Sequence, residues 1–364
     1  MKIADIIDTI DAFAPKQYQE SYDNAGLIVG DKSAECTGVL LCLDTIEAVI
    51  DEAIAKNCNL VVAHHPIVFS GIKQLNGKNY VERVVIKAIK NDIAIYACHT
   101  NLDNVQLGVN HKIGEKLGLQ NLKILAPKKS ILKKLYTYIP TAQKENLLNA
   151  LYQAGAGNIG NYSNCSFSTE GIGSFKANEN ANPTVGKINE THYENETKVE
   201  VLFPIHAERN ILQALFKHHP YEEVAYEIIT LDNMNQNIGS GMIGELNEAM
   251  AELDFLKLLK EKMQCQCIRH TKLLNRPIKT VAFCGGAGSF LLKNAIAAKA
   301  DIFITGDFKY HEFFDADNQI VIADIGHYES EQYTTEIFYN LLTKKFRNFA
   351  VQISTINTNP INYL

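Results

Sequence analysis

The sequence predicts an α/β protein with a small α+β domain inserted in its middle. From Gly38, short apolar runs alternate with amphipathic runs, a pattern typical of parallel strands covered by helices. After about Leu125 this rhythm changes, and from about Gly244 it returns. The same texture on both sides of a different unit indicates one interrupted fold. The predicted parts are residues 1–128, 129–235 and 236–364.

The first part reads as βαβαβ with a parallel sheet. In its first helix the apolar residues recur at i, i+3, i+4, i+7 and i+8 from Ile46, so one face of the helix is apolar. Asp44 stands before this helix as a possible N-cap. The strands and helices are predicted, in order, at residues 38–43, 45–56, 59–63, 80–90 and 93–98.

The middle part reads as a self-contained α+β unit of ferredoxin-like order. Residues 176–197 are polar and rich in turn formers, so an exposed loop is expected there. The other predicted elements are a strand at 132–140, a helix at 145–157, a strand pair around 164–175, a strand at 198–205, a helix at 208–219 and a strand at 222–231.

In the last part the α/β alternation resumes. Strands are predicted at 279–286, 300–307, 318–327 and 349–354, and helices at 290–299 and 330–345.

Composition narrows the class of protein. Lys and Arg number 35 against 41 Asp and Glu, a net charge of −6, so no bulk positive field draws the chain to nucleic acid or anionic lipid, although a local basic groove is compatible with this count. Asp5, Asp8 and Asp11 interrupt the N-terminal apolar pattern, which excludes a secretory signal, and no apolar run could span a membrane. We expect a soluble cytoplasmic protein.

The eight cysteines form no C-x-x-C pair, and most lie in apolar, strand-like contexts. They are expected to be buried thiols in a reducing compartment rather than disulfides or zinc ligands. Any metal site must therefore use histidine and carboxylate side chains.

Histidines and carboxylates follow four predicted strands at the point where each strand ends. Ligands of open α/β sheets bind beyond the carboxyl ends of the strands, so these groups are expected to meet. His327 and Glu331 are four residues apart and would project from one face of a helix. The groups that follow the four strands are His64 and His65; residues 99–103; Asp307 and His311; and His327 to Glu331.

Three imidazoles and two carboxylates are too many ligands for one tetrahedral ion that keeps an open position, and they suit a pair of ions with a bridging carboxylate. Taken singly, a strand-end histidine is more often structural, and an H-x-x-x-E spacing is common by chance. Joint placement favours two divalent ions per chain, and N/O ligands do not distinguish Zn, Mn, Fe, Co and Ni. The predicted ligands are His64, His65, Asp103, His327 and Glu331.

Several further motifs remain open. Asp307 and His311 either support the metal ligands from behind or contact the substrate, with a proton-carrying role for one of them, or they are surface and capping residues. The glycine-rich stretch 284–289 could cradle a phosphate or form a tight turn, and Asp23-Asn24 is similarly ambiguous. The pair His218-His219 in the insert looks like a second metal motif, but its place at a helix end favours a structural role.

These motifs in this order resemble the Nif-three-like family of dinuclear-metal proteins, whose members are called GTP cyclohydrolase I type 2 homologues. The resemblance is carried by LVVAHHPIVFSGIK, ACHTNLDNVQLGVN, VAFCGGAGS, DIFITGDFKYHEF and IADIGHYESE, and covers essentially the whole chain. It implies three-layer parallel or mixed sheets, the same five ligands, a PII/CutA-like insert and a toroidal homohexamer with its metal sites facing an internal cavity. Glu331, and not Glu329, takes the family's glutamate position.

The leading functional hypothesis is a metal-dependent hydrolase that acts on a nucleotide or a related small molecule. In a GTP cyclohydrolase-type reaction, water would open the purine imidazole ring and release formate, with His311 or Asp307 as the proton carrier. The alternative is a non-enzymatic, metal-linked regulator or partner-binding scaffold that uses the PII-like insert. Binding of DNA or RNA is disfavoured by the net charge of −6.

Overall fold

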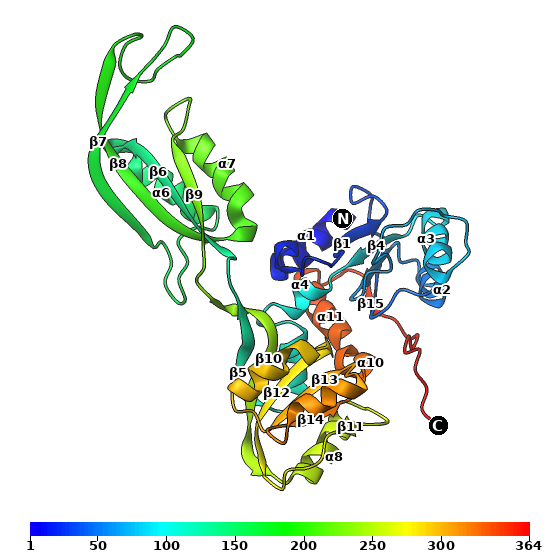
Figure 1. Cartoon of the computed structure of the whole chain (residues 1–364). Helices are drawn as coiled ribbons and strands as arrows, with labels where there is room; N and C mark the ends of the chain where they lie inside the picture. The colour runs from blue at the N-terminus through cyan, green and yellow to red at the C-terminus, as the bar shows by residue number, and fades with distance from the viewer. The chain divides into compact units, whose positions relative to one another are not determined.

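The computed structural model describes residues 1–364, and they form a mixed α/β protein with several sheets. The chain divides into two compact units (Figure 1). The larger unit contains residues 1–127 and 236–364, and the smaller one contains residues 128–235. The first and last thirds of the chain therefore fold together, and the smaller unit is inserted between them.

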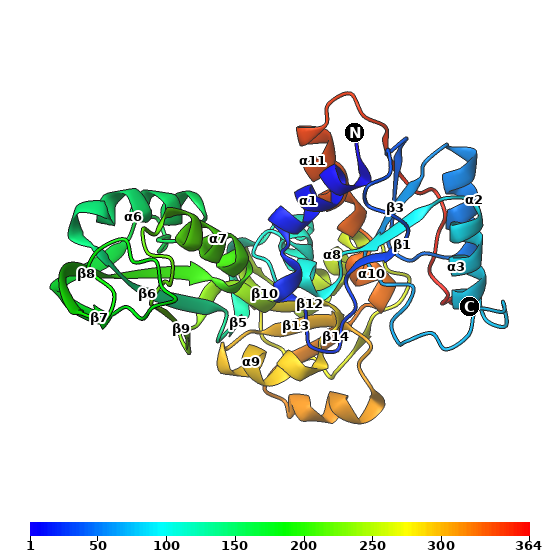
Figure 2. The same cartoon turned by 90° about the horizontal axis from the view of Figure 1, so that it is seen from above.

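The first sheet of the larger unit has the order β1-β4-β3-β2-β15. Its three central strands are parallel, which confirms the predicted βαβαβ unit, and every residue in them is buried. Both faces are covered, because α2 and α3 lie on one face while α1 and α11 lie on the other (Figures 1 and 2). The strands are β1 (Gly26–Val29), β2 (Val39–Cys42), β3 (Leu60–Ala63), β4 (Ala94–Ala97) and β15 (Val351–Ile353), and the helices are α1 (Ile3–Phe13), α2 (Glu47–Ala55), α3 (Tyr80–Lys90) and α11 (Thr334–Lys345).

The second sheet has the order β11-β14-β13-β12-β10-β5, with β12, β13 and β14 parallel. The predicted last strand does not join it. β15 instead pairs with β2, so the C-terminal segment returns to the first sheet. The strands are β5 (Gln120–Lys128), β10 (Asn235–Met250), β11 (Arg269–His270), β12 (Ile278–Ala287), β13 (Ile302–Gly306) and β14 (Val321–Asp324), and the helices nearby are α4 (Thr100–Asp103), α5 (Val109–Lys116), α8 (Glu252–Lys262), α9 (Leu292–Ala297) and α10 (His327–Glu331).

The smaller unit follows the order β6-α6-β7-β8-α7-β9, and its antiparallel sheet has the strand order β7-β8-β6-β9. Its own apolar core includes Leu147, Phe203 and Ile211. The elements are β6 (Leu132–Pro140), α6 (Lys144–Gln153), β7 (Ser166–Lys176), β8 (Thr191–Pro204), α7 (Glu208–His218) and β9 (Tyr226–Leu231).

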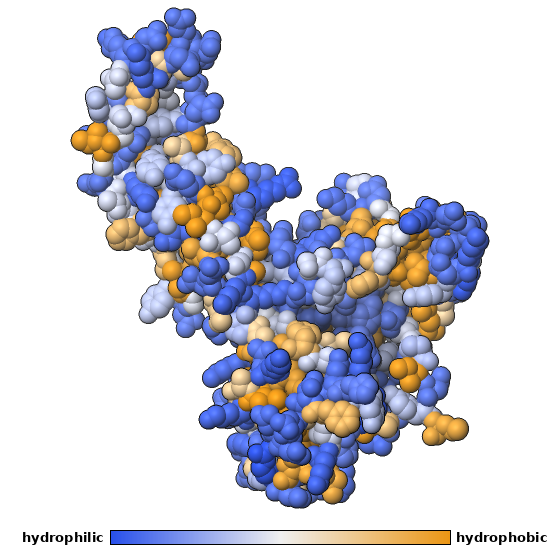
Figure 3. Space-filling view, in the orientation of Figure 1, coloured by the Kyte–Doolittle hydropathy of each residue, from blue (hydrophilic) through white to orange (hydrophobic).

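Two expectations about the smaller unit were wrong. Residues 164–175 hold one strand, β7, and not a strand pair, because its partner β8 begins at Thr191 inside the stretch expected to be a loop. The first half of β8 is polar and shows no alternation of apolar residues, so no local pattern indicated a strand there. Only residues 177–190 between the two strands lack regular structure, and this end of the hairpin is mostly hydrophilic in the space-filling view (Figure 3).

Of the pair His218-His219, His219 has the structural role that the position at a helix end favoured. His219 is buried, its Nε2 lies 2.9 Å from the carbonyl oxygen of Tyr138, and its Nδ1 accepts a hydrogen bond from the backbone N–H of Tyr221. Both ring nitrogens are therefore used by the backbone, and burial lowers the pKa of this imidazole.

The eight cysteines are all free thiols, and most are buried, as expected from their apolar contexts. No helix in the structure combines the length and the apolar character that crossing a bilayer requires.

Candidate metal centre

His64 and His65 directly follow β3, which ends at Ala63. The strand carries them to the edge of the first sheet, where their rings lie with centroids 4.9 Å apart and an interplanar angle of 47°. His64 is fully buried and His65 is half-buried. Because regular strand alternation stops here, both imidazoles reach the same side, as the sequence predicted.

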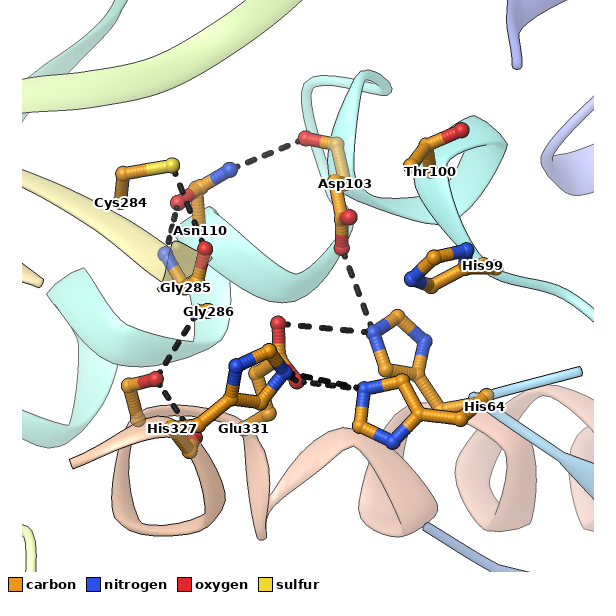
Figure 4. Close-up of polar contacts among 12 residues, drawn as sticks. His64, His99, Thr100, Asp103, Asn110, Cys284, Gly285, Gly286, His327 and Glu331 are labelled. Carbon is orange, nitrogen blue, oxygen red and sulfur yellow. Dashed lines mark hydrogen bonds and ion pairs between the residues drawn. The ribbon is translucent and has the colours of Figure 1, made fainter. Parts of the chain in front are cut away.

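His327 and Glu331 open and close the short helix α10, which follows β14. One turn of helix separates them, and the His327 Nε2 and Glu331 Oε2 atoms are 3.1 Å apart. Asp103 is the last residue of α4, the short helix that follows β4. The two sheets therefore bring together all five predicted residues from three distant segments of the chain (Figure 4).

Glu331 lies at the centre of this cluster. Its Oε2 is 2.9 Å from His65 Nε2 and its Oε1 is 3.7 Å from His64 Nε2. Figure 4 shows the carboxylate between the rings of His327 and His64. Two groups of possible metal ligands share it: one with His65 and His327, and one with His64 and Asp103, each with ligand atoms within 4.8 Å of one another. Glu331 is thus the carboxylate common to both groups.

Two atoms of the cluster are buried without a hydrogen-bond partner. They are His64 Nε2 and Asp103 Oδ1, which lie 3.5 Å apart. A buried polar atom without a partner costs roughly 1–3 kcal/mol, so such atoms are rare unless something else satisfies them. A cation between these two atoms would satisfy both.

The outer nitrogen of each imidazole fixes which tautomer is present. Nδ1 of His65 lies 2.7 Å from Asp44 Oδ1, and Nδ1 of His327 lies 2.7 Å from Asp307 Oδ2. Nδ1 of His64 lies 2.9 Å from a backbone carbonyl oxygen, that of residue 98. Carbonyl and carboxylate oxygens only accept, so each Nδ1 donates and each Nε2 presents a lone pair to the cluster when the ring is neutral.

Lone pairs and negative oxygens therefore converge on the same small volume. The Nε2 atoms of His65 and His327 are only 3.3 Å apart. Two ligands at about 2.1 Å from a tetrahedral ion lie about 3.4 Å from each other, close to the donor separations found here. Histidines held by a carboxylate or carbonyl on the outer nitrogen are the usual surroundings of protein metal ions. The residues present fit the binding of divalent cations.

Without metal, protons must supply the missing positive charge. Burial lowers the pKa of His65, but hydrogen bonds with Asp44 and Glu331 outweigh it and raise that pKa to about 10. Burial also lowers the pKa of His327, but Glu331 and Asp307 outweigh burial and raise that pKa to about 11. Burial and then the charge of Glu331 raise the pKa of Asp103. Burial alone would raise the pKa of Glu331, but His327 and His64 hold it well below its usual value.

Asp44 has a different role from the predicted one. The N-cap of α2 is Ile46, and Asp44 instead orients His65 and accepts a hydrogen bond from Thr358 Oγ1 at 2.7 Å. The C-terminal segment thus reaches the surroundings of the metal centre. A carboxylate before an amphipathic run suits both roles, and only the fold distinguishes them.

Sequence reasoning missed His99 as a site residue. Its ring lies against those of His64 and His65, with centroid distances of 5.3 and 5.4 Å, and together the three form a further group able to hold a metal. Its Nδ1 donates to Asp23 Oδ1 at 2.8 Å. Burial raises the pKa of Asp23, but hydrogen bonds from His99 and Thr100 outweigh burial and lower that pKa to about 2. His99 lies two residues beyond Ala97, the last residue of β4, so it was among the groups expected at this strand end but was not chosen as a site residue.

The two residues predicted to be catalytic do not line the cavity at the cluster. Asp307 is bonded to His327 Nδ1, and this contact positions the ring. His311 is exposed, and its ring lies against those of Tyr310 and Phe314. The segment after β13 turns away from the cluster after Asp307, which places His311 on the surface.

The glycine-rich stretch makes room for the cluster and does not cradle an anion. A Cβ on Gly286 would lie 2.5 Å from Glu331 Oε1, and its φ of +63° also favours glycine. The backbone N–H groups of Gly285, Gly286 and Gly288 are already used, because they donate to Asn110 Oδ1, Ser330 Oγ and Thr305 Oγ1 at 3.0, 2.9 and 2.8 Å.

A cavity of about 470 Å³ opens at the cluster. His65, His99, Asp103, His327 and Glu331 all contribute to its wall. This volume is within the range of small-molecule sites.

Comparisons with known proteins agree over the full length of the chain. The family model Duf34/NIF3 (NGG1p interacting factor 3) matches residues 1–360. A Bacillus subtilis protein named GTP cyclohydrolase 1 type 2 homolog is 37% identical over 365 residues, which cover 99% of this chain and 98% of that protein. A Staphylococcus aureus protein of the same name is 36% identical over 369 residues, and the alignment covers 100% of both chains.

Solved structures give the same result. A Bacillus cereus protein related to NIF3 superposes with a TM-score of 0.85 at 34% identity, with coverage of 100% of this chain and 99% of the other. A Staphylococcus aureus protein superposes with a TM-score of 0.78 at 31% identity and the same coverage. The chain belongs to the Duf34/NIF3 family.

Proposed function

We propose that this protein is a metal-dependent hydrolase that uses two divalent cations to act on a nucleotide or a related small molecule. The observation that carries the proposal is the carboxylate of Glu331, shared by two groups of possible metal ligands in the wall of one cavity. His65 and His327 would hold one cation with Glu331. His64 and Asp103 would hold the other. Nitrogen and oxygen donors suit Zn, Mn, Fe, Co or Ni.

Two such cations, when bound, lower the pKa of a coordinated water to about 7 and stabilise negative charge that develops on a substrate. The chain's own residues supply orientation. Asp44 and Asp307 fix two of the rings, and the carbonyl oxygen of Cys98 fixes that of His64. His99 reaches the cavity beside the cluster, so it replaces His311 and Asp307 as the proposed proton carrier, at its Nε2.

Turnover tests this proposal directly. Metal-loaded protein is incubated with GTP and a panel of nucleotides and related amides and esters, and products are followed by mass spectrometry. The His64→Ala/His65→Ala variant is expected to lose metal and turnover together. His99→Gln is expected to keep its metal and to lose roughly 100- to 10,000-fold in rate. Equal turnover by the wild type and the double variant would reject an enzymatic role for this site.

The smaller unit supports a second candidate function. Its β-α-β-β-α-β order and self-contained core support the proposal of a ferredoxin-like domain of the PII/CutA-like type, a class suited to sensing or partner binding. The protein would then be a metal-linked regulator. This alternative gains if metal occupancy changes the binding of a ligand or partner while no substrate in the panel turns over.

The proposal also includes assembly as a homohexamer, which rests on the family resemblance. Light scattering during gel filtration should then give the mass of six 40.6 kDa chains. A monomer or dimer at micromolar concentration would reject that assembly.

A further inference from the structure

The wall of the cavity at the metal cluster carries negative charge and aromatic rings. Four carboxylates line it, Glu20, Asp44, Asp103 and Glu331, and no Lys or Arg is among the lining residues. Two divalent cations would add four positive charges to four negative ones, so the loaded cavity has no formal excess of positive charge. Asp23 and Asp307, each bonded to a histidine of the cluster, add further negative charge.

A phosphate chain would find few partners in this cavity. Phosphate sites in proteins combine Arg or Lys with free backbone N–H groups, often in a glycine-rich turn. Here the N–H groups of Gly285, Gly286 and Gly288 are bonded to side chains of the protein itself. Each phosphate group adds about one to two negative charges at neutral pH, and these would lie near Glu20 and Asp44.

Aromatic rings form the more exposed part of the wall. Tyr22 and Phe69 lie with ring centroids 6.3 Å apart, and Phe69 lies 6.1 Å from the ring of His99. The exposed fractions of Tyr22, Phe69 and Phe290 are 62%, 51% and 65%. Large rings left open beside a polar cluster gain free energy when a flat ligand covers them, because rings stack and apolar surface leaves water.

The three asparagines of the wall are already committed to the protein, and Asn359 donates to Glu329 Oε1 and accepts from the backbone N–H of Ile361. Asn110 bridges the backbone carbonyl of Asp103 and the backbone N–H of Gly285, while Asn104 donates to Tyr18 and Glu20. Recognition of a ligand is therefore left mainly to the aromatic rings and the metal cluster.

We propose that the substrate of this site is an uncharged, planar heterocycle with a carbonyl group, of the size of a nucleobase, a nucleoside or a cyclic amide, and not a nucleoside triphosphate. The proposal rests on the hydrolase function above and specifies its substrate class. The ring would lie against Tyr22 and Phe69, with its carbonyl toward the cluster.

Binding, measured apart from turnover, tests the substrate class. Guanosine, adenosine and uridine are each compared with their triphosphates by isothermal titration calorimetry on zinc-loaded full-length protein freed of excess metal, with zinc content measured before and after. At least one nucleoside should bind roughly tenfold or more tightly than its triphosphate. Tighter binding of the triphosphates would overturn the proposal, and so would the absence of binding by every nucleoside.

Variants of the wall test the role of the rings. Phe69→Ala should weaken nucleoside binding roughly fivefold to a hundredfold, the range for loss of one base-stacking ring, with zinc content unchanged. Phe167→Ala, at an exposed phenylalanine of the smaller unit, is the control and should have no effect. Phe290→Arg should shift preference toward the triphosphate. Unchanged nucleoside affinity in Phe69→Ala would reject the stacking wall.

These outcomes separate this inference from the proposed function. If the protein takes up none of Zn, Mn, Fe, Co and Ni, or if no substrate turns over, the hydrolase proposal fails. If zinc is bound and triphosphates are preferred, only the substrate class proposed here fails.

Discussion

Replacing Glu331 with Gln is expected to abolish the binding of both metal ions. The two oxygens of Glu331 face two separate groups of ligands, so one substitution removes a charged ligand from each. Loss of a residue that only hydrogen-bonds a metal ligand costs about 10- to 100-fold in metal affinity, and loss of a ligand shared by both ions should cost more. Elemental analysis after dialysis against buffered zinc should fall from two ions per chain to fewer than one.

Glu329→Gln is the matched control for this substitution. Glu329 is a buried glutamate of the same helix, α10, and its Oε1 accepts from Asn359 Nδ2 at 3.2 Å, a role that the amide oxygen of Gln can also fill. It belongs to neither group of metal ligands. The control should keep two ions per chain. Two tightly held ions in Glu331→Gln would contradict the bridging role.

Metal is expected to stabilise the protein more at pH 8.5 than at pH 6. In metal-free protein His65 and His327 have pKa values of about 10 and 11, so both carry protons at these pH values and metal must displace them. Apparent metal affinity should rise by roughly tenfold per pH unit for each proton displaced, which adds about 1.4 kcal/mol of stabilisation per unit and proton once metal exceeds its dissociation constant.

The metal-free protein should show the opposite trend. A histidine whose pKa is raised in the folded state stabilises the fold fully below its unfolded value of about 6.5, and loses that contribution as pH rises toward the folded value. The melting temperature of chelator-treated protein should therefore fall between pH 6.5 and 10, while that of zinc-loaded protein is maintained. Differential scanning fluorimetry with and without EDTA measures both. A metal-induced shift independent of pH would contradict proton displacement at these histidines.

The sequence was sufficient to find the five residues that meet in the cluster. The carboxyl ends of neighbouring parallel strands meet at one edge of a sheet, so the groups that follow β3 and β4 could be placed near each other without coordinates. The i, i+4 spacing of His327 and Glu331 fixed their common face in the same way. These two relations are local consequences of strand and helix geometry, whereas β14 lies in the second sheet, so only the packing of the two sheets brought His327 and Glu331 to the histidines after β3.

Residues that orient a histidine of the site by a hydrogen bond could not be found in this way. Asp44 has the local appearance of an N-cap, and Asp23 that of a turn residue, yet each bonds an imidazole far away in the sequence. The same limit affected the smaller unit, where the polar start of β8 gave no apolar alternation and was expected to be a loop. Long-range pairing decides such positions, and no local pattern records it.

The sequence by itself determined the α/β class, the position of the insert and the polar groups at the strand ends, because hydrophobic periodicity is a local property of the chain. Only the tertiary structure decided that Glu331 faces two groups of ligands, that His99 reaches the cavity and His311 does not, and that the glycine-rich stretch makes room for a carboxylate. These facts depend on how two sheets pack against each other, and distances of a few ångströms between distant segments are set by that packing alone.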